Sequence, residues 1–128
     1  MSTRIMTELA DEIGEAVLGR SADEATRALM LAWRQYVVRH PNRYAAISQA
    51  ADQGAADAGK RLIDIMLATL RAYGLTESDA IHAVRCLRAV THGFALLEVE
   101  GAFGLPEKLD DTYDLLIHMV ITGLRPPD

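Results

Sequence analysis

The sequence offers few side chains whose types and spacing could hold a metal ion. His82 and His92 are ten residues apart, which is about 15 Å along one helix, so they cannot share a metal within one subunit. The pattern Asp79-Ala-Ile-His82 occurs once, whereas a helical di-iron centre needs two Glu-x-x-His pairs and two further carboxylates. We therefore expect no metal site and no cofactor.

Motifs for nucleophilic or redox catalysis are also missing. The sequence has no Ser-His-Asp order, no glycine-rich phosphate loop and no Cys-x-x-Cys pair. Cys86 is the only cysteine, and we expect it to be a small core residue of a helix rather than a nucleophile. A lone cysteine cannot form an intramolecular disulfide, which fits the reducing cytoplasm. The sequence thus predicts a cytoplasmic protein that is not an enzyme and has no catalytic residue.

Large apolar and aromatic side chains at helical spacing are better suited to binding a small molecule. Trp33 and Tyr36 lie three apart and offer flat surfaces with a polar edge, and methionines such as Met66 adapt to varied ligand shapes. Ligand sites are mostly apolar with a few placed polar groups. We expect an effector cavity inside each subunit, lined by Trp33, Tyr36, Met66, Leu70, Leu87 and Thr91. The same residues at the same spacing would also be typical of an ordinary hydrophobic core, so a ligand cavity and a solid core both remain open as interpretations.

Helices must position these side chains. Among the 128 residues, 20 Ala and 16 Leu outnumber the 15 Val and Ile together, a composition that favours helix over sheet. Ser21 with Glu24 and Thr76 with Asp79 match the capping-box pattern, and Asp110 is expected to cap the final helix. The sequence predicts one all-α domain over residues 1–128, with helices over about 2–18, 22–39, 43–52, 57–73, 77–100 and 110–124.

The charge balance disfavours contact with nucleic acid. A net charge of −5 repels phosphate and gives no counterion-release affinity. Residues 77–128 hold four basic and nine acidic side chains, so the excess belongs to the last two helices and the loop between them. No apolar run is long enough to span a membrane, and no signal peptide precedes the first helix. We therefore expect no membrane partner.

The last two helices are too apolar for the surface of a small monomer. The stretch 115–124 is apolar nearly all round and must be buried on more than one side. A twofold homodimer that joins these helices from both subunits into a four-helix bundle would bury them, with Gly93 and Gly123 allowing close crossings. The expected interface residues are Val90, Phe94, Leu97, Tyr113, Ile117, Val120 and Ile121. In the alternative, one helix sits at the centre of a monomer.

Two motifs then resemble a known family. The stretch from His82 to Glu98, His-Ala-Val-Arg-Cys-Leu-Arg-Ala-Val-Thr-His-Gly-Phe-Ala-Leu-Leu-Glu, and Gly101-Ala-Phe-Gly-Leu105 are similar to the C-terminal domain of TetR-family transcriptional regulators. The resemblance covers nearly the whole chain and is strongest to the branch named for a Trp-His-Gly motif. In this chain Val90-Thr91 precede His92-Gly93, so the Trp is replaced.

The resemblance implies a helical bundle that binds small, mostly apolar effectors and dimerises through its last two long helices. Family members read DNA through an N-terminal helix-turn-helix, and this chain contains none. Three explanations remain open: a domain taken from a longer protein, a start placed too far downstream, or a regulator without its DNA reader. A different class of function also stays open, in which the chain is a helical dimer that acts only as a protein–protein interaction module.

Overall fold

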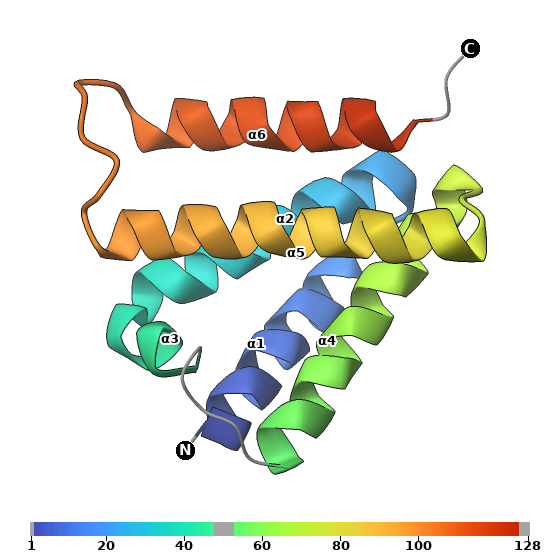
Figure 1. Ribbon diagram of the computed structural model, residues 1–128, viewed down its shortest axis with the longest axis horizontal. Coiled ribbons are helices and arrows are strands. Elements are labelled where there is room, and N and C mark those ends of the chain that lie inside the picture. The colour runs from blue at the N-terminus through green and yellow to red at the C-terminus, as the bar shows by residue number, and fades with distance from the viewer. Residues whose placement is uncertain (1, 48–52, 126–128) are drawn as a thin grey trace.

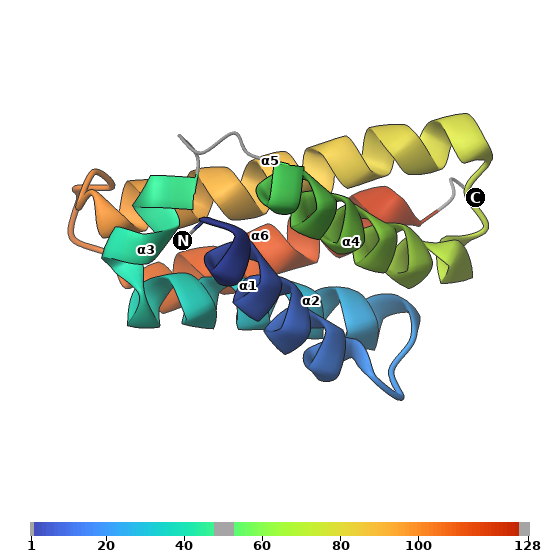
Figure 2. The ribbon, with the colours of Figure 1, turned by 90° about the horizontal axis from the view of Figure 1, so that it is seen from below.

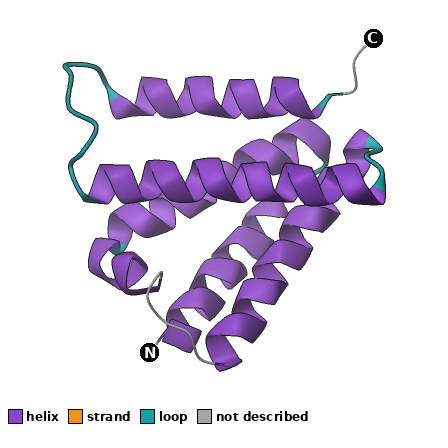
Figure 3. Cartoon of the chain, in the orientation of Figure 1, coloured by secondary structure: helices purple, strands orange, loops and turns teal. Residues whose placement is uncertain are grey.

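The computed structural model describes residues 2–47 and 53–125, and these are helical apart from short connections (Figures 1 and 3). The helices are α1 (Ser2–Val17), α2 (Ala22–Arg39), α3 (Pro41–Ile47), α4 (Gln53–Leu70), the 3-10 turn η1 (Arg71–Tyr73), α5 (Glu77–Val99) and α6 (Leu109–Leu124). No strand occurs within the described ranges. The all-α prediction is confirmed. The expected short helix over 43–52 begins earlier, at Pro41, and residues 48–52 lie outside the described part of the chain.

Local capping explains some of the helix starts and not others. The Thr76 side chain accepts a hydrogen bond from the Asp79 backbone N–H at 3.2 Å, which confirms that capping prediction. Ser21 makes no such bond, because Ala22 has a left-handed φ of 50° that distorts the first turn. Asp110 does not cap α6, which begins one residue earlier after Lys108, and its carboxylate instead binds a distant arginine.

The helices form two groups that cross at a steep angle. In Figure 1, α5 and α6 run side by side in opposite directions, while α1 and α4 pass together behind α5. Figure 2 shows α2 running along the α5–α6 pair on its inner side. α2 packs against α1, α5 and α6, and α1 packs against both α2 and α4. α4 also packs against α5, so α2 and α4 together connect the two groups, and α2 is the one of these two that packs substantially against α6.

Four of the residues expected at a dimer interface belong to the core of this chain instead. Phe94, Tyr113, Ile117 and Ile121 are 6%, 1%, 0% and 8% exposed. Their side chains pack in the buried cluster that includes α2 residues, and the Tyr113 hydroxyl donates a hydrogen bond to the Met30 carbonyl. They have almost no surface left for a second subunit. That part of the sequence interpretation is therefore wrong, because α2 covers the inner faces of α5 and α6.

Candidate functional site

A small cavity lies where α1, α2, α3, α4 and α5 meet. Its volume is about 280 Å3, and it is more enclosed than the broad hollow on the opposite side of α2. Most of the lining residues are apolar, but polar atoms gathered on one side make up about half of the surface that the cavity exposes. The lining residues are Met6, Leu9, Trp33, Tyr44, Gly59, Leu62, Ile63, Met66, Arg88 and His92.

Helical periodicity brings these side chains to one place. α4 contributes Leu62 and Met66, and α5 contributes Arg88 and His92, each pair four residues apart and so on one face of its helix. Gly59 lies one turn before Ile63 on α4 and has no side chain, which leaves room for the cavity there. A Cβ built at Gly59 would lie 3.8 Å from the Met6 terminal methyl.

The polar edge is a chain of three aromatic side chains. The Trp33 Nε1–H donates to the Tyr44 hydroxyl at 3.0 Å, and that hydroxyl lies 2.6 Å from the His92 Nδ1. Burial raises the pKa of Tyr44 to about 12, so it stays protonated. Burial, together with the positive charge of Arg88, lowers the pKa of His92 below its ordinary value. At neutral pH the edge therefore carries a neutral imidazole beside one guanidinium.

Two of the six expected ligand residues, Trp33 and Met66, line this cavity. Tyr36, Leu70, Leu87 and Thr91 are buried in the core and are not among the lining residues. The Tyr36 hydroxyl turns toward α1, where it donates to the Ile5 carbonyl and to Glu8, and burial raises its pKa to about 12. The Thr91 hydroxyl donates to the Leu87 carbonyl of its own helix.

Sequence reasoning missed the role of Tyr44 in the cavity. Its hydroxyl lies 2.6 Å from the His92 Nδ1, a contact between α3 and α5 that residue spacing along one helix does not reveal. His82 and Arg85 are exposed. Cys86 is also exposed, which contradicts its assignment to the core: it lies on the outer side of α5, opposite the residues that pack against α2.

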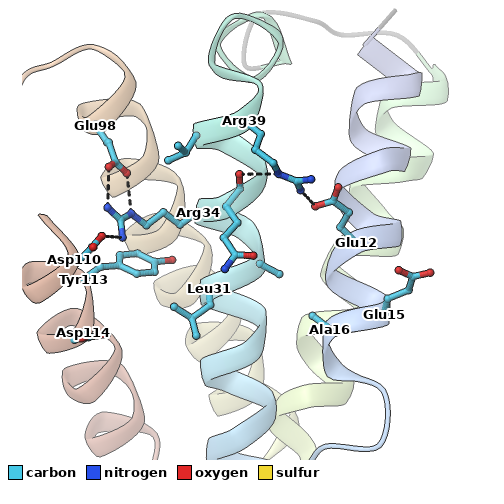
Figure 4. A pocket seen from close by; sticks show the side chains of 13 residues that line it. Glu12, Glu15, Ala16, Leu31, Arg34, Arg39, Glu98, Asp110, Tyr113 and Asp114 are labelled. Atoms are coloured by element: carbon cyan, nitrogen blue, oxygen red, sulfur yellow. Dashed lines mark hydrogen bonds and ion pairs between the residues drawn. The ribbon is translucent and has the colours of Figure 1, made fainter.

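A larger hollow, of about 980 Å3, is an open groove between α1 and α6 with α2 as its floor. Figure 4 shows its side chains: carboxylates stand on both walls, and Leu31 lies on the floor. The carboxylates on its walls are Glu12, Glu15, Glu98, Asp110 and Asp114. The groove is wide and open and carries charged side chains on both walls, whereas small-molecule sites enclose most of the ligand and have few polar groups. The smaller cavity fits a small apolar ligand better.

Arg34 fixes one wall of this groove. Its guanidinium donates two hydrogen bonds to Glu98, each at 2.9 Å, and one to Asp110 at 2.7 Å. It also lies 5.5 Å and 5.3 Å from the ring centroids of Phe94 and Tyr113. One side chain of α2 thus holds α5 and the start of α6, and two acidic residues of the last two helices pair within their own chain.

The outer side of α5 and α6 carries apolar side chains that are exposed or only partly buried. Leu97, Leu115 and Met119 are 42%, 58% and 60% exposed, and the expected interface residues Val90 and Val120 are half-buried. Gly93 and Gly123 lie inside these helices with no atom within 4 Å of an added Cβ. A mid-helix glycine costs about 1 kcal/mol relative to alanine. Nothing within the described chain requires a missing side chain at either position.

Residues 2–47 and 53–125 contain neither a candidate metal-binding cluster nor a candidate membrane-spanning helix. No group of three or more His, Cys, Asp or Glu side chains there could hold a metal ion. None of the helices described is both long enough and apolar enough to cross a membrane.

The described helices thus combine a partly enclosed cavity with exposed apolar side chains on the outer side of α5 and α6. Residues 26–120 match the family described as "Tetracyclin repressor-like, C-terminal domain". Because the match covers most of the chain, the protein belongs to this family, and the resemblance to TetR-family regulators is confirmed.

Two curated relatives support the same assignment. An uncharacterized HTH-type transcriptional regulator of Bacillus subtilis, YobS, is 28% identical over 126 residues, which cover 97% of this chain and 66% of that protein. An uncharacterized HTH-type transcriptional regulator of Mycobacterium tuberculosis, Rv0681, is 29% identical over 109 residues, which cover 77% of this chain and 47% of that protein. The chain therefore spans about half to two thirds of the length of these relatives.

Proposed function

We propose that this chain is the effector-binding and dimerisation domain of a TetR-like transcriptional regulator, and that a small apolar effector binds in the cavity between α1 and α5. The observation that carries the proposal is the cavity itself, about 280 Å3, whose lining residues are mainly apolar while its polar atoms gather at one edge. This combination is typical of small-molecule sites. A module that only paired with another protein would have no need of an enclosed cavity.

The second part of the proposal is a twofold homodimer through the outer faces of α5 and α6. Its interface would comprise the residues with surface left to bury, namely Val90, Leu97, Leu115, Met119 and Val120. Close approach of a partner helix accounts for the open space at Gly93 and Gly123. Each chain would then bring its own cavity, and an effector could alter how the two subunits pack.

The cavity is tested by filling it. In Gly59→Met, a flexible side chain occupies the space beside Met6 without removing any hydrogen bond of the polar edge. The matched control is Lys60→Met, one residue further along α4, where the wild-type side chain is 77% exposed. Thermal unfolding is followed with a panel of small apolar molecules, because a ligand that binds only the folded state raises the melting temperature.

We expect at least one compound of the panel to stabilise the wild type and Lys60→Met equally and to leave Gly59→Met unchanged. If each stabilising compound also stabilises Gly59→Met to the same extent, binding occurs elsewhere and the cavity is not the effector site.

The dimer is tested by placing charge on the outer face. Leu115→Glu with Met119→Glu is expected to give monomers at micromolar concentration in light scattering, because the carboxylates would be buried without partners. Leu18→Glu is the control, since Leu18 is 75% exposed in the turn after α1. A wild-type monomer, or a dimer that survives both charges, would overturn this interface.

A further inference from the structure

The hydrogen-bond chain along the cavity edge determines which groups face a ligand. Tyr44 is 2% exposed, and its hydroxyl already accepts a hydrogen bond from the Trp33 N–H. If Tyr44 also accepted from His92, its own hydroxyl proton would be buried without a partner, which is costly. Tyr44 therefore donates its proton to the His92 Nδ1.

A neutral imidazole that accepts at one nitrogen carries its proton on the other. His92 is thus the tautomer with hydrogen on Nε2. Within the described residues no hydrogen-bond partner of that Nε2–H is found, and His92 is half-buried on the cavity lining. The Trp33–Tyr44–His92 chain therefore ends in a donor that a ligand can use.

Arg88 adds positive charge beside this donor. It lies one turn before His92 on α5, lines the same cavity, and its charge acts on both His92 and Tyr44. No ion pair joins it to a carboxylate of the described residues, and none of the described residues that line the cavity is an Asp or Glu. The polar edge thus presents donors and a positive charge, with no free acceptor.

We propose that the effector is an apolar carboxylate, whose anion lies against Arg88 and the His92 Nε2–H while its apolar body packs between Met6, Leu62 and Met66. This proposal rests on the proposed function and specifies its ligand class. A carboxylate supplies acceptors and a negative charge, the complement of this edge. An amine would bring donors and a like charge to the same place, and an alcohol or amide would lack the charge.

The test compares compounds that share a carbon skeleton. Straight-chain carboxylates of four to ten carbons and phenyl-substituted carboxylates are titrated calorimetrically into the full chain, each beside the primary amide, the alcohol and the amine of the same skeleton. We expect the best carboxylate to bind about tenfold more tightly than its amide, an energy difference of about 1.4 kcal/mol. Arg88→Gln is expected to remove this preference.

Arg85→Gln is the matched control, because Arg85 is an exposed arginine of the same helix that does not line the cavity. It should leave the preference intact. The carboxylate proposal is overturned if amides, alcohols or amines bind as tightly as the carboxylates, if the preference survives Arg88→Gln, or if no carboxylate binds. If neutral compounds bind tightly and Gly59→Met abolishes their binding, the effector is not a carboxylate but the cavity is still the effector site.

The tautomer is tested separately and needs no ligand. Nitrogen chemical shifts of the His92 ring should show the Nε2–H form in the wild type and a mixture of both forms in Tyr44→Phe, which lacks the hydroxyl donor. A wild-type ring with its proton on Nδ1 would contradict the hydrogen-bond direction and with it the donor offered to the ligand.

Discussion

Replacement of Arg34 by methionine should destabilise the fold much more than the same change at a neighbouring arginine. Arg34 joins α2 to Glu98 of α5 and to Asp110 of α6. Its side chain is 16% exposed and that of Glu98 is 17% exposed, whereas Asp110 is 84% exposed. Methionine is an unbranched apolar side chain that removes the charge, every hydrogen-bond donor and the guanidinium contacts with the Phe94 and Tyr113 rings.

The magnitude follows from the burial of the pair. Removing one partner of a buried ion pair costs about 3–5 kcal/mol, because the other charge is left without compensation. Glu98 keeps some access to water and Asp110 keeps most of its hydration, so we expect a loss at the lower end, about 3 kcal/mol. The control is Arg39→Met on the same helix: Arg39 is 54% exposed and pairs with the partly exposed Glu12, and such surface pairs contribute about 1 kcal/mol or less.

Urea unfolding at one fixed protein concentration measures both losses, since association would otherwise shift the midpoints. Arg34→Met should lower the free energy of unfolding by about 2 kcal/mol more than Arg39→Met does, the difference between the two estimates above. In a double-mutant cycle with Glu98→Gln, the two changes should cost less together than the sum of each alone. Equal losses for the two arginine variants would refute the argument that Arg34 fastens α5 and α6 to the body of the molecule.

Three smaller changes test individual contacts by thermal or urea unfolding. Tyr44→Phe leaves the buried Trp33 N–H without an acceptor and should cost about 1–3 kcal/mol; no loss would contradict that bond. Because the pKa of His92 is lowered in the fold from 6.5, the unfolded chain binds the proton more readily, so stability should fall as pH drops below about 6.5. In His92→Phe the fall in stability below about pH 6.5 should be smaller. A pH profile identical to that of the wild type would show that His92 does not cause this fall. Thr76→Ala should lower the free energy of unfolding by about 1 kcal/mol and Ser21→Ala should leave it almost unchanged, because only the Thr76 side chain makes a capping hydrogen bond. Equal losses for the two variants would contradict this difference in capping.

The helix pattern was predictable because its signals are local. The sequence predicted 22–39 for the helix that spans Ala22–Arg39, and Thr76 marks the start of α5 through a bond to a residue three positions away. The faces of α5 and α6 were not predictable in the same way. A helix that is apolar nearly all round carries no signal for which side meets α2 and which remains outside, and so Phe94 and Tyr113 were assigned to the wrong surface.

The cavity depends on contacts between distant parts of the chain. Trp33 and Met66 were identified by residue type, but Tyr44 reaches the edge only because α3 brings it to His92, 48 residues away. The partners of Arg34 are 64 and 76 residues away. Such contacts depend on the packing of whole helices, which residue spacing along one helix does not reveal.

The central claim, that the cavity between α1 and α5 holds the effector, is tested most directly by the methionine methyl resonances. Met6 and Met66 line the cavity, Met30 is buried in the core outside it, and Met119 is exposed on α6. On titration of the wild type with the most stabilising compound of the panel, the resonances of Met6 and Met66 should shift first and most. Shifts confined to Met119, or none at Met6 and Met66 at saturation, would contradict the account.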